Sequence, residues 1–188
     1  MKATIETNTQ RTHPHKFMLW LGIGSICMMF AGLTSAYIVK KNQSNFLVFS
    51  LPNVFWYSTI VIVLSSATIY LATKFFKENK RSYKLLISLT ALLGLLFAAM
   101  QIAGFSNLES HGIRLVGFGS NAAASFILVI VGLHMLHVLG GVIALLFLSF
   151  KANFSNKINS NNLEIVSTYW HFVDVLWIYL LVFFIWIR

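Results

Sequence analysis

Five long stretches almost free of charged side chains constrain the fold of this sequence more than any other feature. A helix needs roughly 20 apolar residues to cross a hydrocarbon core about 30 Å thick. The stretches approach or exceed that length, and 57% of the 188 residues are hydrophobic while only 10% are charged. A soluble domain carries roughly 25% charged residues. The sequence therefore predicts an all-α, polytopic membrane protein built as a bundle of five transmembrane helices.

The predicted spans make up a single transmembrane domain over residues 1–188. They are about 17–39, 54–73, 85–105, 122–150 and 166–187. The fourth stretch is uncharged from Leu115 to Phe150, and its 36 residues would make a straight helix of roughly 54 Å, too long for one crossing. Because glycines and polar residues fill its first part, we place the helix start near Ala122 and residues 115–121 at the membrane interface.

Lysine and arginine predict the orientation, because cytoplasmic loops retain basic residues. With the N-terminus in the cytoplasm, ten basic residues lie on the cytoplasmic side: Lys2, Arg11, Lys16, Lys74, Lys77, Lys80, Arg81, Lys84, Lys151 and Lys157. Four lie on the other side: Lys40, Lys41, Arg114 and Arg188. We therefore expect a cytoplasmic N-terminus and a periplasmic C-terminus.

The basic balance and the single cysteine exclude several other classes of protein. The net charge of +9 comes from residues in short loops between apolar runs, not from a basic stripe, so we expect no nucleic-acid partner. Cys27 is the only cysteine and lies in the first span. An internal disulfide or a cysteine-based metal cluster is therefore excluded.

Ionisable side chains inside the membrane are the candidate site residues. His134 and His137 lie three apart in the fourth span, and His171 and Asp174 lie three apart in the fifth, so each pair shares a helix face. A charged Asp at a helix centre costs roughly 2.5–3.5 kcal/mol on insertion scales, so Asp174 should face protein or a wet cavity. His171 is its expected partner.

Two further polar residues extend this candidate cluster. Glu164 comes just before the fifth span, where it could join the cluster or be solvated, and Gln101 in the third span is expected to bond a neighbouring helix. Three hypotheses compete: a metal or haem site, a proton relay or transport site, and a hydrogen-bonded cluster that fixes helix packing. We favour the packing cluster, with no catalytic, cofactor-binding or metal-ligating residue, because bulky neighbours surround both histidine pairs.

Two sequence segments resemble a known family. The run Tyr-Trp-His-Phe-Val-Asp-Val-Leu-Trp at 169–177 is similar to the signature of the last helix in subunit III of the cytochrome c oxidase family. The run Gly-Leu-His-Met-Leu-His-Val at 132–138 is similar to the Gly-x-His-x-x-His-Val stretch of the preceding helix, and Glu164 stands at the family's spacing. Weaker agreement covers nearly the whole chain, which resembles the short, five-helix bacterial form.

The resemblance implies a haem-free third subunit of a haem-copper terminal oxidase in the bacterial cytoplasmic (inner) membrane. It implies that this chain packs mainly against catalytic subunit I, with subunit II and other respiratory subunits as further partners. It also implies that the chain sustains proton uptake and protects the active site during turnover. Haem and copper would then belong to partner subunits, with membrane lipids, including a bound phospholipid, as further contacts.

The chain also departs from the family pattern, and alternatives follow. Ile26 stands where many members carry a membrane-embedded glutamate, and Gly104 stands where some carry a second carboxylate, so no proton role of those carboxylates transfers to this chain. Alternatives within the family are a subunit III of a quinol oxidase and an accessory protein of nitric oxide reduction. A stand-alone proton-coupled transporter is the alternative from a different class.

Overall fold

A computed structural model describes residues 14–41, 54–78, 80–110, 122–154 and 160–187 of the chain. These ranges hold five helices and no strand: α1 (Pro14–Lys41), α2 (Val54–Lys77), α3 (Tyr83–Ser110), α4 (Ala122–Phe154) and α5 (Ser160–Trp186). Each helix is long and apolar enough to cross a membrane. The predicted all-α class with five membrane-spanning helices is confirmed, and the chain is a multi-pass membrane protein.

The helices extend past the apolar spans that the sequence delimits. Helix α4 begins at Ala122 and has 33 residues, which corresponds to roughly 50 Å against a core of about 30 Å. Helix α5 begins at Ser160, ahead of the span expected from 166. Hydropathy marks where lipid ends, whereas helical hydrogen bonds continue into the polar interface. The expected interfacial segment 115–121 lies outside the described residues.

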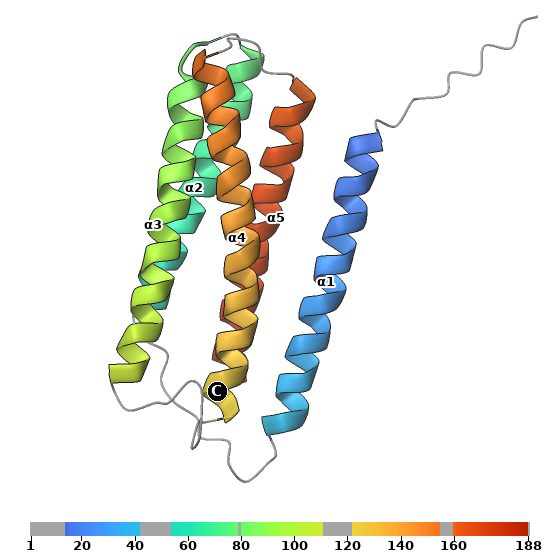
Figure 1. Ribbon diagram of the computed structural model, residues 1–188, viewed down its shortest axis with the longest axis vertical. Helices are drawn as coiled ribbons and strands as arrows, with labels where there is room; N and C mark the ends of the chain where they lie inside the picture. Colours follow the sequence, from blue (N-terminus) through green and yellow to red (C-terminus); the bar gives the residue numbers. More distant parts are fainter. Residues whose placement is uncertain (1–13, 42–53, 79, 111–121, 155–159, 188) are drawn as a thin grey trace, which may run out of the picture.

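Helices α2 to α5 form a bundle, and α1 is added to one side of it (Figure 1). Helix α2 packs on α3 and α5, α3 also packs on α4, and α4 also packs on α5. Helix α1 contacts α4 and α5 but, among the described residues, neither α2 nor α3. Helices α4 and α5 are therefore the central elements, since each of them touches three other helices.

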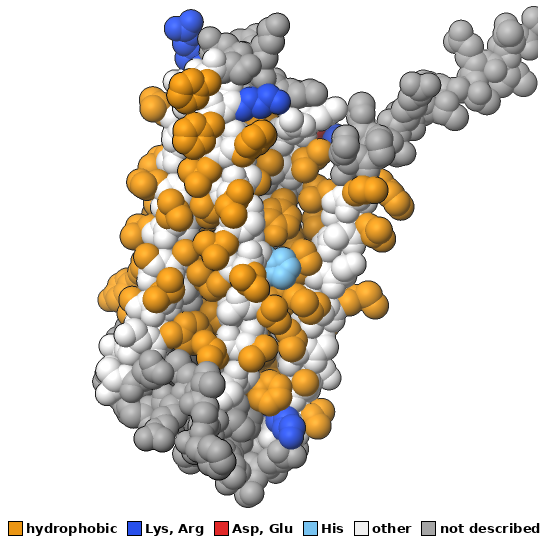
Figure 2. Space-filling view, in the orientation of Figure 1, with side chains coloured by type: hydrophobic (Ala, Val, Ile, Leu, Met, Phe, Trp, Pro, Cys, Tyr) orange, Lys and Arg blue, Asp and Glu red, His pale blue; other side chains and the backbone are white. Residues whose placement is uncertain are grey.

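The interior and the exterior of the bundle are both apolar. Ile62, Ile87 and Ile130 have no exposed surface, whereas Met28 is 79% exposed and Phe147 is 69% exposed. Figure 2 shows hydrophobic side chains over the middle of one face, with basic side chains near the two ends. An exterior of this kind faces lipid, so close packing and inter-helix hydrogen bonds, not burial from water, must select the helix contacts.

Candidate functional site: polar side chains between the helices

Hydroxyl side chains of α2 connect this helix to α5. Four of them lie at two adjacent positions that recur seven residues later. We call them the α2 hydroxyl row: Ser58, Thr59, Ser65 and Ser66. Trp170 Nε1 donates to Ser65 Oγ at 2.9 Å and Trp177 Nε1 donates to Thr59 Oγ1 at 3.0 Å. His171 Nδ1 is hydrogen-bonded to Ser66 Oγ at 2.6 Å. Sequence reasoning did not identify these hydroxyls as polar contacts, although their spacing was visible.

Gln101 connects α3 to the same row. Its Nε2 atom donates to Ser58 Oγ at 2.9 Å, and both side chains are buried. Its Oε1 atom has no partner among the described residues. Gln101 therefore lies apart from the histidines and Asp174 in the hydrogen-bond pattern and joins α3 to α2.

Trp170 fills a slot between three helices. The indole has no exposed surface, and its ring lies directly against glycines of α3 and α4. A Cβ atom added at Gly94 would lie 2.6 Å from Trp170 Cη2, and one at Gly141 would lie 2.9 Å from Trp170 Cε3. With Ser65 holding the indole nitrogen, this ring fixes the separation of α2, α3 and α4 from α5.

His134 lies in an aromatic box. Its ring stacks on Trp177 at 5.3 Å between centroids and meets the edges or faces of Phe30 and Phe97 at 6.5 and 6.1 Å. Both ring nitrogens are buried and have no hydrogen-bond partner among the described residues. Since His134 is fully enclosed, its imidazole packs as an aromatic ring in this arrangement.

His137 is engaged mainly with its own helix. Its Nδ1 atom donates to the carbonyl oxygen of Leu133 at 2.7 Å. Its backbone carbonyl accepts a hydrogen bond from the Tyr169 hydroxyl at 3.1 Å, which ties α4 to α5. His134 and His137 share a face of α4, but they have different partners.

Asp174 does not make the contact expected from its spacing to His171. Its side chain is 3% exposed, and neither carboxyl oxygen has a hydrogen-bond partner among the described residues. Ser66 lies beside this carboxyl, while the Ser66 hydroxyl is bonded to His171. Residues three apart on a helix point roughly 60° away from each other, so His171 turns toward α2 and Asp174 turns into the interior.

Glu164 lies outside the polar interior. It pairs with Lys16 of α1 at 2.9 Å, and the two side chains are 58% and 39% exposed. Further along the same interface the hydroxyls of Thr34 and Tyr179 are hydrogen-bonded at 3.0 Å. These polar contacts tie α1 to α5.

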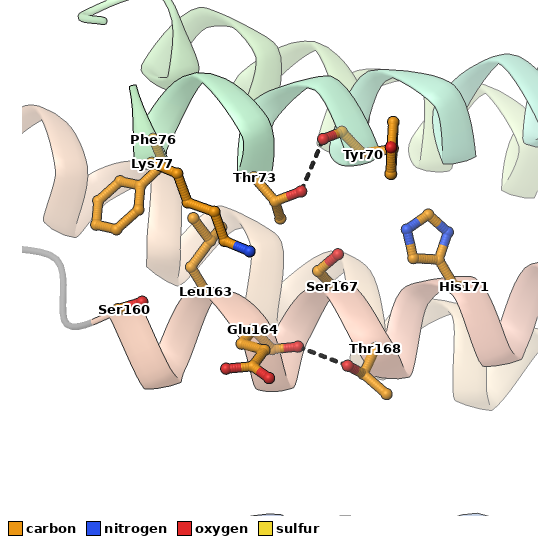
Figure 3. Close-up of a pocket in the computed structure, with 10 residues that line it drawn as sticks. All are labelled: Tyr70, Thr73, Phe76, Lys77, Ser160, Leu163, Glu164, Ser167, Thr168 and His171. Carbon is orange, nitrogen blue, oxygen red and sulfur yellow. Dashed lines mark hydrogen bonds between the residues drawn. The ribbon is translucent and has the colours of Figure 1, made fainter. Parts of the chain in front are cut away.

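A pocket of about 240 Å³ opens between the end of α2 and the start of α5, and we call it the α2–α5 pocket. Figure 3 shows Lys77 and Ser160 toward one end and the His171 ring at the other, between the two helices. Glu164, Thr73 and Ser167 add polar groups to its lining. The pocket therefore gives polar access along α5 from one end of the bundle.

The polar residues that the sequence predicted as one cluster do not form a single group in the structure. Among the residues that the structure describes, no three His, Cys, Asp or Glu side chains are grouped closely enough to hold a metal ion. Gln101 bonds to α2, and Glu164 bonds to α1. His171 and Asp174 converge on a shared polar neighbour, Ser66.

Comparison with known proteins gives consistent matches. The family model described as cytochrome c oxidase subunit III matches residues 16–188. Cytochrome c oxidase subunit 3 of Bacillus sp. (strain PS3) is 27% identical, covering 95% of this chain and 88% of the relative. Cytochrome bo(3) ubiquinol oxidase subunit 3 of Buchnera aphidicola subsp. Schizaphis graminum is 31% identical, covering 86% of this chain and 88% of the relative. A probable quinol oxidase subunit 3 of Staphylococcus haemolyticus is 28% identical, covering 94% of this chain and 90% of the relative.

Proposed function

The chain belongs to the cytochrome c oxidase subunit III family, and from this premise we propose that it is the non-redox third subunit of a respiratory cytochrome c oxidase. The observation that carries the proposal is the family match over residues 16–188, which includes nearly all of the described helices. As a subunit III of the haem-copper oxidase family, the chain associates with other oxidase subunits. We propose that catalytic subunit I is its main contact and that subunit II completes the core of the complex.

The chain's own part in this complex follows from its interior. Tryptophan-to-hydroxyl hydrogen bonds tie α5 to α2, and the Trp170 ring packs α5 closely against glycines of α3 and α4. The enclosed His134 and the pairing of Glu164 with Lys16 support a chain that binds no haem or copper itself. In the proposal, haem and copper reside in partner subunits, and this chain supports their stability, proton uptake and lasting turnover during aerobic electron transport.

The electron donor separates two forms of the proposal. The relative from Bacillus supports a cytochrome c oxidase, whereas the relatives from Buchnera and Staphylococcus are named for quinol oxidases and favour a quinol oxidase as the second candidate. An affinity-tagged chain purified in gentle detergent should bring down a haem-copper subunit I. The purified complex should oxidise reduced cytochrome c; oxidation of quinol alone would establish the second candidate.

The same purification tests the absence of redox centres in this chain. Asp174→Ala should weaken assembly, because it leaves a void in a buried mid-helix position, while any assembled complex keeps its haem spectrum. Gly132→Ala is the control, since an added Cβ there meets nothing within 4 Å. Stoichiometric iron or copper on the isolated chain would contradict the proposal.

We also propose a location in the bacterial cytoplasmic (inner) membrane with the N-terminus in the cytoplasm. Lys74 and Lys77 in the last turn of α2, with Lys80 just after it, support this orientation. Alkaline phosphatase, which is active only outside the cytoplasm, should be active when it is fused after residue 188 and inactive when fused within 78–82. The reverse pattern would invert the orientation.

A further inference from the structure

Asp174 is a carboxyl side chain buried in the interior of the bundle. It lies fourteen residues after Ser160 on α5, roughly 21 Å along a helix of about 40 Å, and therefore near the middle of the membrane. Its side chain is 3% exposed, and its two oxygens accept no hydrogen bond from the described residues. An unpaired carboxylate in this position is costly, and such groups mark functional sites more often than packing sites.

A polar route approaches Asp174 from one end of the bundle. The α2–α5 pocket extends along α5 from Ser160 to His171, eleven residues or roughly 16 Å. Its lining includes Ser167 and Thr168, and its volume of about 240 Å³ accommodates several water molecules. Figure 3 shows the His171 ring at the inner end of the labelled lining. Water can therefore reach the imidazole from the end of α2.

Two side chains connect this pocket to the buried carboxyl. His171 Nδ1 is hydrogen-bonded to Ser66 Oγ at 2.6 Å, and Ser66 lies beside the carboxyl of Asp174. An imidazole carries a proton donor and an acceptor on opposite sides of its ring, and a hydroxyl both donates and accepts. Each link can therefore receive a proton on one side and release one on the other.

Among the described residues, α5 offers no buried polar side chain beyond Asp174 that would continue this route. Every described residue of α5 that is buried beyond Asp174 is apolar or aromatic: Leu176, Trp177, Leu180, Leu181, Phe183 and Phe184. Trp177 stacks on both Phe55 and His134, and its single polar atom donates to Thr59. Along the described residues of α5, polar access to Asp174 therefore comes from the side of the α2–α5 pocket.

We propose that Asp174 is a proton-exchange site. It equilibrates, through His171 and Ser66, with water in the α2–α5 pocket. One ring nitrogen of His171 takes a proton from pocket water while Nδ1 gives its proton to Ser66 Oγ. The Ser66 hydroxyl in turn passes its own proton to a carboxylate oxygen of Asp174. One proton leaves water and one O–H bond forms on Asp174, and neither His171 nor Ser66 changes its net charge.

Other titratable side chains on the elements around α5 have different surroundings. Glu164 is paired with Lys16 of α1. On α4, His134 is enclosed by aromatic rings, and His137 donates to Leu133. Lys77 of α2 lines the pocket near its outer end. His171 is the titratable side chain of the described pocket lining that contacts Ser66.

Infrared spectroscopy of the assembled oxidase tests this proposal. The protonated carboxyl of Asp174 should give a C=O stretching band that is absent in Asp174→Asn, and transfer to D₂O should move this band rapidly to lower wavenumber. Ser66→Ala and His171→Phe should each slow that exchange roughly a hundredfold, the lower end of what a positioned proton donor contributes. The band itself should persist in both variants.

Ser65→Ala is the matched control, because Ser65 neighbours Ser66 in the sequence but bonds to Trp170. It should leave the exchange rate of the Asp174 band unchanged while perturbing the same pair of helices. The proposal is overturned if no band depends on Asp174, if Ser66→Ala and His171→Phe exchange as fast as the wild type, or if Ser65→Ala slows exchange equally. The measurement does not depend on the electron donor, so it stands or fails separately from the proposed function.

Discussion

The slot that holds Trp170 predicts a selective response to adding a single methyl group. In Gly94→Ala the new Cβ would lie 2.6 Å from Trp170 Cη2 and 2.9 Å from Val142 Cγ2, and in Gly141→Ala it would lie 2.9 Å from Trp170 Cε3. Carbon atoms in favourable contact are about 3.5–4.0 Å apart. The atoms at Gly94 must therefore separate by roughly 1 Å.

The indole cannot supply that movement alone. Trp170 is fully buried and its nitrogen is bonded to Ser65, so relief requires α3 or α4 to shift relative to α5. Overpacking of this kind costs about 1–3 kcal/mol. The higher helix propensity of alanine offsets up to about 1 kcal/mol of it. We therefore expect Gly94→Ala and Gly141→Ala to lower the free energy of unfolding by about 1–3 kcal/mol relative to a glycine-to-alanine change made in open space.

Gly132→Ala supplies that reference, because it is also in α4 and its Cβ would meet nothing within 4 Å. Reversible unfolding of the full chain in mixed micelles, followed by circular dichroism, measures all three variants. Adding Trp170→Phe to Gly94→Ala removes the ring atoms that clash, so the double variant should be more stable than the sum of the single effects by about 0.5–3 kcal/mol. Equal stability changes at the three glycines, or strict additivity with Trp170→Phe, would refute the slot as a determinant of helix spacing.

Three further predictions follow from individual contacts. Gln101→Leu should change the free energy of unfolding by less than about 1 kcal/mol. Inter-helix hydrogen bonds in membranes, such as the one from Gln101 to Ser58, average about 0.6 kcal/mol, and the substitution also removes the unpartnered Oε1 atom. A loss of stability above about 2 kcal/mol would contradict this prediction. The hydrogen bond and charge of Lys80 lower the pKa of Glu78, so any stabilisation from the pair is present above the unfolded-state pKa and is lost as pH falls through the folded-state pKa. Lys80→Gln should raise the pKa of Glu78 in a carboxyl ¹³C NMR titration, and an unchanged value would exclude the pair. Cys27 is exposed on a membrane-spanning helix, so a charged maleimide should label it only after denaturation, whereas labelling in intact membranes would place it in water.

The helices were predictable because lipid leaves the backbone few alternatives. A segment in hydrocarbon must satisfy its own backbone hydrogen bonds, so the charge-free runs predict helices without knowledge of their neighbours. The helix ends were less predictable. Helix α5 begins at Ser160 because helical hydrogen bonding does not require apolar side chains, and Glu164 lies within the helix while its carboxylate reaches Lys16.

The partners of the polar side chains could not be predicted from spacing alone. His171 and Asp174 share a helix face and both lie near Ser66, but only the His171 ring is hydrogen-bonded to its hydroxyl, while neither carboxyl oxygen of Asp174 has a hydrogen-bond partner among the described residues. That outcome depends on the register between α2 and α5, which is set by large and small side chains such as Trp170 and Gly94 fitting together in space. A pattern along one helix does not contain this register.

The α2 hydroxyl row shows where sequence reasoning overlooked a usable signal. Ser58 and Ser65 are seven residues apart, as are Thr59 and Ser66, a spacing of about two helical turns that places each pair on one face. Hydropathy treats serine and threonine as nearly neutral, so a search for charged and strongly polar residues in the spans does not single out these positions. The hydroxyls of Ser65 and Thr59 accept from the two buried tryptophans of α5, while Ser58 and Ser66 bond Gln101 and His171.

The contacts of α1 also constrain how the molecule is made. Helix α1 touches α4 and α5 among the described helices, through pairs such as Lys16 with Glu164, Thr34 with Tyr179, and Lys41 with the carbonyl of Ile187. During synthesis on the ribosome, α1 therefore enters the bilayer before α4 and α5, the described helices that it contacts, have been made. Its packing in this bundle must await both helices, and a nascent chain that stalls before α5 leaves α1 without these contacts and exposed to membrane quality control.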